Sequence, residues 1–267
     1  MKVHHLNCGT FDSPLAGTIV CHALACETDN GIVLVDTGFG LADLADRSRR
    51  LGPLPRLMGA KFFESETAVR RLEGLGFATS DVTHIVATHL DFDHIGGAGD
   101  FPNATIHTTA VEDAAARARA SASDKVRYRP AQQPPDSEMR TYSGPGEPLL
   151  GFPDAHRLDT IGDGFFLLPL PGHTKGHAAV AVDTGNGWLV HAGDAFYHHS
   201  VVAPPGVDSP GFQGRFMRVV EKVLADDRSR ISENHRRLRE LNTQQSSHVT
   251  VFCAHDRKQL EELQQRG

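Results

Sequence analysis

One short segment carries four residues of the kinds that bind metal ions. Residues 88–97 read THLDFDHIGG, which places His89, Asp91, Asp93 and His94 within six positions. In an extended segment residues 89, 91 and 93 project to one side, and a bend at the two glycines can bring His94 to the same place. Imidazoles and carboxylates together suit zinc, iron or manganese. The segment therefore predicts a loop that serves two metal ions.

Three further ligand candidates each follow a predicted strand. His173 lies in PGHTKGH, Asp194 in HAGDAFY and His255 in FCAHD. Loops that leave one edge of a sheet lie close together, so residues distant in sequence can meet there. We therefore expect these three side chains to join the segment 88–97 at one site.

The elements that must position these residues follow from apolar periodicity and turn signals. Strands are expected over residues 18–27, 32–36, 82–87, 105–109, 165–170, 178–184, 188–192 and 248–253. Helices are expected over residues 41–50, 65–75, 110–120, 216–224, 233–241 and 257–264. The segment 129–148 is rich in Pro, Gly, Gln and Ser, and we interpret it as a loop insertion near the site.

The composition is that of a globular chain without a membrane or nucleic-acid signal. The 267 residues carry 27 Lys and Arg against 33 Asp and Glu, a net charge of −6, with no long basic block. No run reaches the roughly 18 apolar residues of a membrane span, and the first residues lack a signal-peptide core. The cysteines Cys8, Cys21, Cys26 and Cys253 form no CxxC pair, so no disulfide framework is expected. We expect a cytoplasmic protein with one domain over residues 1–267 that acts on a small molecule and binds neither nucleic acid nor membrane; a homodimer is left open.

The ordered motifs resemble those of the metallo-β-lactamase superfamily, in which HxHxDH precedes a later His, an Asp and a last His. Residues 35–38 (VDTG) and 171–174 (PGHT) resemble two more motifs of that family. The resemblance covers nearly the whole chain and implies an α/β fold, a four-layer αββα sandwich with a two-metal site at one edge of its sheets. It also implies the ligands: His89, Asp91 and His173 for the first ion, Asp93, His94 and His255 for the second, and Asp194 between them.

Asp91 departs from the family pattern, which usually has a second His at this position. A carboxylate can also bind a metal ion, and the related flavodiiron proteins carry Glu there. Three carboxylates and a bridging hydroxide cancel the charge of two divalent ions, whereas the His version leaves one positive charge. We expect two divalent ions, with zinc as the first choice. Because a neutral cluster favours harder metals, iron or manganese are expected to compete with zinc.

Tyr197 follows Asp194 by three residues, and the N-acyl-homoserine lactonase branch of the superfamily carries a Tyr at the same offset. A phenol there can donate a hydrogen bond to a developing oxyanion, and Asp93 can pass a proton to the leaving group. The resemblance therefore implies a metal-dependent hydrolase that uses a metal-bridging water or hydroxide on a small ester, with a lactone preferred.

Two other functions stay open at this point. One is an iron-dependent redox enzyme of the same fold, similar to persulfide dioxygenases or flavodiiron proteins. The other is a degenerate metal-binding module without catalysis. Among the remaining polar residues, Asp36 and His177 are interpreted as supports of the ligands, while His198 and His199 face either substrate or solvent.

Overall fold

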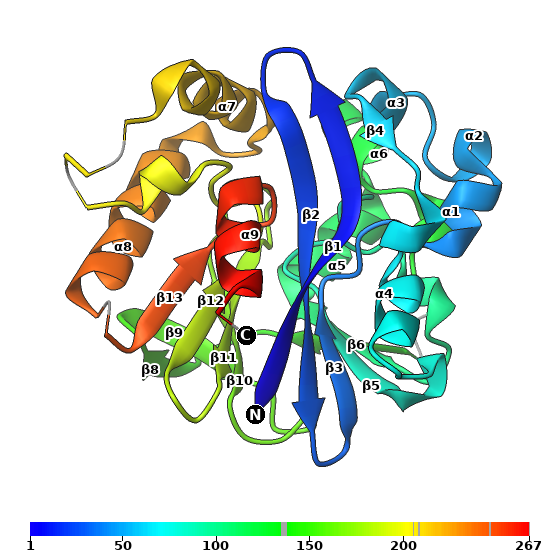
Figure 1. The fold of residues 1–267 in the computed structure, drawn as a ribbon, viewed down its shortest axis with the longest axis horizontal. Helices are drawn as coiled ribbons and strands as arrows, with labels where there is room; N and C mark the ends of the chain where they lie inside the picture. The colour runs from blue at the N-terminus through cyan, green and yellow to red at the C-terminus, as the bar shows by residue number, and fades with distance from the viewer. Residues whose placement is uncertain (135–137, 205, 208, 246, 267) are drawn as a thin grey trace.

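Two β-sheets packed face to face form the centre of the molecule (Figure 1). The computed structural model describes residues 1–134, 138–204, 206–207, 209–245 and 247–266. The first sheet has the order β4-β1-β2-β3-β5-β6-β7, with β1 Lys2–Ser13, β2 Gly17–Thr28, β3 Gly31–Val35, β4 Ala60–Lys61, β5 Val82–Val86, β6 Thr105–Thr109 and β7 Met139–Tyr142. The second has the order β13-β12-β11-β10-β9-β8, with β8 Glu147–Leu149, β9 Phe152–Arg157, β10 Phe165–Pro169, β11 Ala178–Asp183, β12 Trp188–His191 and β13 Val249–Phe252.

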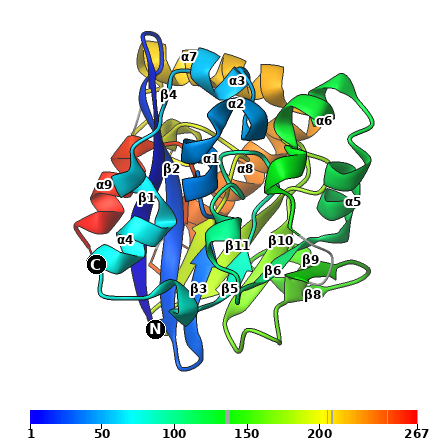
Figure 2. The ribbon, with the colours of Figure 1, turned by 90° about the vertical axis from the view of Figure 1, so that its right-hand side faces the viewer.

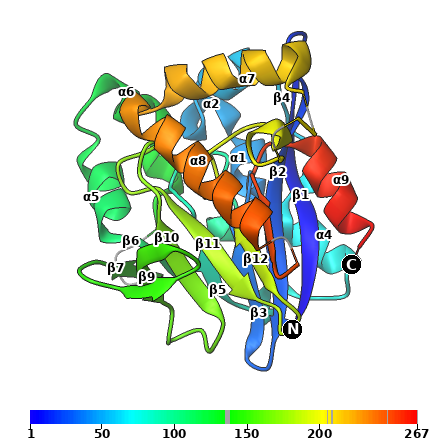
Figure 3. The ribbon, with the colours of Figure 1, turned by 90° about the vertical axis from the view of Figure 1, so that its left-hand side faces the viewer.

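Helices pack around the two sheets. They are α1 Leu41–Ala45, α2 Arg47–Arg50, α3 Leu54–Leu57, α4 Ala68–Gly74, α5 Ala110–Ala118, α6 Ala122–Arg127, α7 Gly211–Leu224, α8 Arg228–Gln244 and α9 Arg257–Gln264. Figure 2 shows α1, α4 and α5 in front of the first sheet, and Figure 3 shows α8 across the outer face of the second. The four-layer αββα sandwich expected from the sequence is confirmed.

The space between the sheets is filled by apolar side chains from both. Leu24, Val33 and Val86 of the first sheet pack in one cluster with Val180 and Phe252 of the second. All five side chains are fully buried. At roughly 25 cal/mol per Å² of apolar surface removed from water, such packing is the main force that holds the two sheets together. The inner faces thus form a rigid base for the loops at their edge.

The strand β1 was not predicted, because polar residues interrupt its apolar pattern. It pairs with β2 from Lys2 opposite Glu27 to Ser13 opposite Gly17. Its polar side chains find partners across the strand pair: His4 Nε2 lies 2.6 Å from the Glu27 carboxylate. Pairing to a neighbouring strand, a tertiary contact, therefore compensates for weak periodicity.

Two other sequence expectations are corrected by the structure. The helix expected over residues 41–50 is split into α1 and α2, because Asp46 leaves the helical conformation and caps α2 through the amide of Arg49. The segment 129–148, expected as a loop, contains β7 and β8, which form edge strands of the two sheets; residues 135–137 lie outside the described part. Turn-forming residues hid these short strands, which depend on the neighbouring strands for their hydrogen bonds.

The strand ends that matter for the site meet at one edge of the sandwich. β3 and β5 run parallel, as do β12 and β13, so the residues after each pair emerge together. The amide of Ala178, at the start of β11, donates to the carbonyl of Thr88 at 2.9 Å, and the amide of His22 donates to the carbonyl of Ala254 at 2.8 Å. These two hydrogen bonds tie the loops of one sheet to those of the other.

Candidate metal centre

The seven side chains expected as ligands converge at this edge, and all are buried. They form two adjoining groups that share Asp194. The first cluster is His89, Asp91, His173 and Asp194. The second cluster is Asp93, His94, His255 and Asp194.

Distances within the first cluster are those of ligands around one small cation. Asp91 Oδ2 lies 3.0 Å from His173 Nε2 and 3.5 Å from His89 Nε2. Asp194 Oδ2 lies 3.4 Å from His173 Nε2 and 3.9 Å from His89 Nε2. In a tetrahedron with bonds of about 2.0–2.1 Å, neighbouring ligand atoms are roughly 3.3 Å apart, so the arrangement fits zinc.

The second cluster has the same dimensions around the other oxygen of the shared carboxylate. Asp194 Oδ1 lies 3.0 Å from His255 Nε2 and 3.2 Å from His94 Nε2. Asp93 approaches the same two rings, at 3.7 Å from His255 Nε2 and 3.9 Å from His94 Nε2. Asp194 is therefore placed to bridge two ions.

Several buried polar atoms of both clusters lack the partner that burial normally requires. His89 Nε2, Asp91 Oδ1, His94 Nε2 and Asp194 Oδ1 make no hydrogen bond within the described residues. Such buried atoms cost roughly 1–3 kcal/mol each unless something else satisfies them. Imidazole nitrogens and carboxylate oxygens that face one another in this way fit divalent cations.

Each histidine of the centre is held through Nδ1, which leaves Nε2 for the site. His94 Nδ1 donates to Asp36 Oδ2 at 2.8 Å, and His255 Nδ1 donates to the carbonyl of Val20 at 2.8 Å. The hydroxyl of Thr88 lies 3.0 Å from His89 Nδ1, and the hydroxyl of Tyr197 lies 3.3 Å from His173 Nδ1. A hydrogen bond on one ring nitrogen fixes the tautomer and the direction of the other.

Asp36 supports the loop beneath the second cluster. It accepts from the amide and the hydroxyl of Thr88, both at 2.8 Å, and from His94. Its backbone has φ = 57°, a conformation that is costly for a residue with a Cβ and is retained where the surroundings fix it. Burial would raise the pKa of this carboxyl, but the nearby His94 outweighs it and the pKa is lowered. Asp36 thus remains an anion that orients His94.

His177 and Gly193 position the shared carboxylate. His177 Nε2 accepts from the backbone amide of Asp194 at 3.0 Å, the supporting role expected from the sequence. Gly193 has φ = +51°, and a Cβ there would lie 2.6 Å from His177 Nε2. Any larger residue at position 193 would therefore clash with His177 and disturb the hydrogen bond that positions the backbone of Asp194.

The charges of the centre depend on one another. Burial would raise the pKa of Asp194, but His255, His94 and His173 hold it well below its usual value. Burial would lower the pKa of His94 and of His255, but Asp194 raises both. Asp93 is different, because burial raises its pKa despite the two nearby rings.

Arg127, at the end of α6, contacts the first cluster and was missed in the sequence. Its Nη1 donates to Asp91 Oδ2 at 2.9 Å and lies 3.2 Å from His173 Nε2. Burial would raise the pKa of Asp91, but the charge of Arg127 and then that of His89 hold it well below its usual value. Arg127 adds one positive charge beside Asp91, which returns the total to that of a centre with His at this position. The net charge of the centre therefore gives iron or manganese no advantage over zinc.

Glu112 of α5 is a second supporting residue that sequence analysis did not single out. It is buried and accepts from the amide of Leu90 at 2.9 Å, the hydroxyl of Thr174 at 2.7 Å and the amide of Gly176 at 3.1 Å. It thus joins the loop of the first motif to the loop that carries His173. Its position in an alanine-rich helix gave no sequence signal for this role.

Tyr197 lies at the junction of the two clusters and a cavity. Its hydroxyl donates to Asp194 Oδ2 at 3.1 Å, and burial raises its pKa well above the usual value, so it is a proton donor at neutral pH. The cavity has a volume of about 430 Å³ and reaches Asp91, Asp93, His173, Asp194 and His255. Its other walls are mainly apolar and come from β1, β2, α3, α6 and α7: Phe11, Ile19, Leu54, Met58, Val126, Met217, Val220 and Leu224.

The histidines left open by the sequence lie outside the two clusters. His198 and His199 face a second, more polar hollow of about 310 Å³ beside the centre. His199 Nδ1 bonds Asp256 Oδ2 at 2.7 Å. No described residue of the segment 129–148 lines the cavity that reaches the two clusters; Gln132 instead donates to the carbonyl of Phe92, beneath the motif loop.

The edge of this sandwich gathers two adjoining groups of His and Asp side chains, the ligand types that metal-dependent hydrolases use. The profile of the Metallo-beta-lactamase superfamily matches residues 16–235, and the chain belongs to this superfamily. A protein of Mycobacterium tuberculosis described as a probable metallo-hydrolase is 45% identical over 261 residues, which cover 96% of this chain and 80% of that protein. An N-acyl homoserine lactonase of Bacillus cereus is 28% identical over 171 residues, 64% of this chain and 60% of that enzyme.

Solved structures agree with the fold. A variant of the AiiA protein of B. thuringiensis, with N-decanoyl-L-homoserine bound at its active site, superposes with a TM-score of 0.71 over 98% of this chain and 95% of its own, at 20% identity. A dizinc quorum-quenching lactonase, AidC, superposes with a TM-score of 0.57 over 90% of this chain and 74% of its own, at 19% identity. The protein is thus a metallo-hydrolase of this superfamily, and its buried His and Asp side chains form groups that could hold metal ions. No helix among the described residues has the length and apolar character needed to cross a membrane.

Proposed function

We propose that this protein is a lactonase that opens a cyclic ester carrying an apolar substituent. The observation that carries the proposal is the cavity of about 430 Å³, because its apolar walls end directly at the two clusters. A site of this kind binds an apolar tail by burial and presents one polar group to the centre. The small-molecule ligands of the related lactonases, an N-acyl-homoserine among them, have this chemistry.

The seven side chains of the two clusters are the ligands in this proposal. His89, Asp91 and His173 would hold one ion, Asp93, His94 and His255 would hold the other, and Asp194 would contact both. Two divalent ions would supply Lewis acidity and a water of lowered pKa. Zinc suits the imidazole-rich set, and Arg127 removes the charge argument in favour of iron or manganese.

Tyr197 and Asp93 carry the proton chemistry. The Tyr197 hydroxyl lines the cavity and can donate a hydrogen bond to the carbonyl oxygen of the ester as negative charge develops there. Asp93 also lines the cavity, where its carboxylate can accept a proton. Asp93 takes a proton from the attacking water and gives it to the ring oxygen as the carbon–oxygen bond breaks.

Purified protein, loaded with zinc and checked by elemental analysis, tests the proposal on four substrate classes. These are lactones with short and long acyl chains, aryl esters, phosphodiesters and thioesters. We expect kcat/KM for the long-chain lactone to exceed the others by tenfold or more, with activity lost on chelation and regained with zinc. Faster turnover of a thioester or phosphodiester would contradict the lactonase assignment. Iron in the isolated protein together with oxygen uptake on a thiol would favour the redox alternative.

A further inference from the structure

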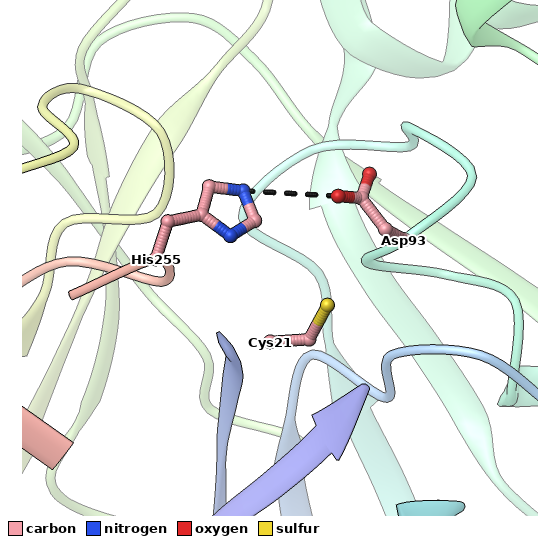
Figure 4. A group of neighbouring side chains, drawn as sticks. All are labelled: Cys21, Asp93 and His255. Carbon is pink, nitrogen blue, oxygen red and sulfur yellow. Dashed lines mark ion pairs between the residues drawn. The ribbon is translucent and has the colours of Figure 1, made fainter. Parts of the chain in front are cut away.

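Cys21 is a buried thiol that lies beside the second cluster. It sits on β2 and is 3% exposed. Figure 4 shows its sulfur directed into the gap between His255 and Asp93. A ligand atom from each of the three residues lies within 4.8 Å of the other two, and His255 Nε2 is 3.7 Å from Asp93 Oδ2.

Two backbone contacts fix the thiol at this place. Val20, the residue before Cys21, accepts from His255 Nδ1 at 2.8 Å, and His22, the residue after it, donates to the carbonyl of Ala254 at 2.8 Å. The strand that carries the thiol and the loop that carries His255 are therefore joined on both sides of Cys21. Side chains alternate along a strand, so the direction of the thiol is set by that of the backbone.

All four cysteines pack against apolar residues, but they differ in their polar neighbours. Cys26, on the same strand, is packed among apolar residues between the two sheets. Cys8 and Cys253 are also buried, and none of these three belongs to a group of potential ligands in the described residues. Cys21 alone combines a buried thiol with a carboxylate and an imidazole at ligand spacing.

A second observation indicates a cation position next to His255, a member of the same group as the thiol. Asp194 Oδ1 and His94 Nε2, both of the second cluster, are buried without a hydrogen bond. They lie 3.2 Å apart, and Asp194 Oδ1 is 3.0 Å from His255 Nε2. Buried polar atoms that face one another without a hydrogen bond can be satisfied by a metal ion bound between them.

We propose that Cys21 is a further ligand of the second metal position, joining Asp93, His94, His255 and Asp194. A sulfur–metal bond forms, the thiol proton leaves to solvent, and no atom changes oxidation state. Thiolate is a soft ligand, so this position takes zinc or cobalt in preference to manganese or magnesium. The inference rests on the proposed two-metal centre, but not on the lactone substrate.

Cobalt substitution tests the proposal, because a sulfur ligand gives cobalt an intense near-ultraviolet charge-transfer absorption that nitrogen and oxygen ligands do not. The full-length protein is stripped with a chelator and titrated with Co²⁺. We expect the absorption to grow as Co²⁺ fills the second metal position of the unaltered protein, and to be absent from Cys21→Ala and Cys21→Ser. Cys26→Ala removes a thiol of the same strand and should keep the absorption unchanged.

Zinc affinity gives a second measurement that does not depend on colour. In competition with a chelator, Cys21→Ser should bind the second zinc about tenfold or more weakly, while Cys26→Ala should match the unaltered protein. No charge-transfer absorption in the unaltered protein, or its survival in Cys21→Ser, would overturn the proposal. Lactone hydrolysis is measured separately, so an inactive protein that shows the sulfur absorption contradicts the lactonase assignment and leaves the Cys21 ligand standing.

Discussion

Arg127 and Asp91 form a buried ion pair at the edge of the metal centre. Nη1 of Arg127 lies 2.9 Å from Oδ2 of Asp91, and each residue is only 7% exposed. The pair places a guanidinium from α6 beside the carboxylate that stands where the family pattern usually has a His. The effect of Asp91 on the charge of the centre therefore depends on Arg127.

The pair predicts strong coupling between substitutions at the two positions. In metal-free protein, Arg127→Met should lower the free energy of unfolding by about 3–5 kcal/mol, because Asp91 is left as an unpaired buried charge. Asp91→Asn together with Arg127→Met should cost less than the two single changes added, by about 1–3 kcal/mol. Urea unfolding of the four proteins measures this coupling. Additivity within about 0.5 kcal/mol would show that the two side chains do not interact.

Asp36 predicts an effect on metal binding without contact to the ions. Asp36→Asn keeps the size of the side chain but weakens the bonds to His94 and Thr88. We expect metal affinity, measured by competition with a chelator, to fall about 10- to 100-fold. Asp100→Asn is the control, because Asp100 accepts from the amide of Leu41, away from the clusters. Equal affinity in the Asp36 variant would remove it from the support of the site.

Tyr197 predicts a change in turnover rather than in metal content. Tyr197→Phe removes the hydroxyl that faces Asp194 and the cavity. Loss of one donor to a developing oxyanion typically costs about 10²-fold in kcat, so we expect a fall of that order with both zinc ions retained. Tyr142→Phe, whose hydroxyl contacts His107, should leave kcat unchanged. A Tyr197 variant with full turnover would limit this residue to packing.

The cavity predicts a dependence on acyl chain length. Each buried CH₂ contributes about 0.8 kcal/mol, so kcat/KM should rise about fourfold per added CH₂ until the cavity is full. Met217→Ala should flatten this trend, since Met217 is a buried cavity residue of α7. Val219→Ala is the matched control, because Val219 is 59% exposed on the same helix. Steady-state rates over a series of lactones provide the measurement, and an unchanged trend in the Met217 variant would place the acyl chain elsewhere.

His107 predicts that acid destabilises the fold away from the metal centre. Burial, and then the neighbouring His84, lower its pKa from 6.5 to about 3. Below about pH 6.5 the unfolded chain therefore binds a proton at His107 that the folded chain does not bind. The free energy of unfolding falls as the pH is lowered through this range. The slope contributed by one such group approaches about 1.4 kcal/mol per pH unit. Between pH 6.5 and 4, His107→Asn should lose less unfolding free energy than the unaltered protein; parallel pH profiles would contradict this.

The position of most strands could be predicted from the sequence because their signals are local. β5 has a short apolar run, and β2 and β3 flank an Asn-Gly turn. β1, β4, β7, β8 and β9 were not predicted, since they are short or obscured by polar or turn-forming residues and depend on hydrogen bonds to other strands. Likewise, nothing in the residues 41–50 announces that Asp46 ends one helix and caps the next.

The sequence by itself determined the superfamily and the set of side chains that converge, because metal ligands must be of a few chemical types at restricted spacings within short loops. Only the tertiary structure decided which groups surround them. Arg127 and Cys21 come from a helix and a strand whose own sequences carry no metal motif, and they reach the clusters through the packing of the sandwich. Arg127 acts through its charge, and Cys21 through the proposed metal bond, over a few ångströms in space. Neither effect produces a period or a spacing along the chain by which it could be recognised.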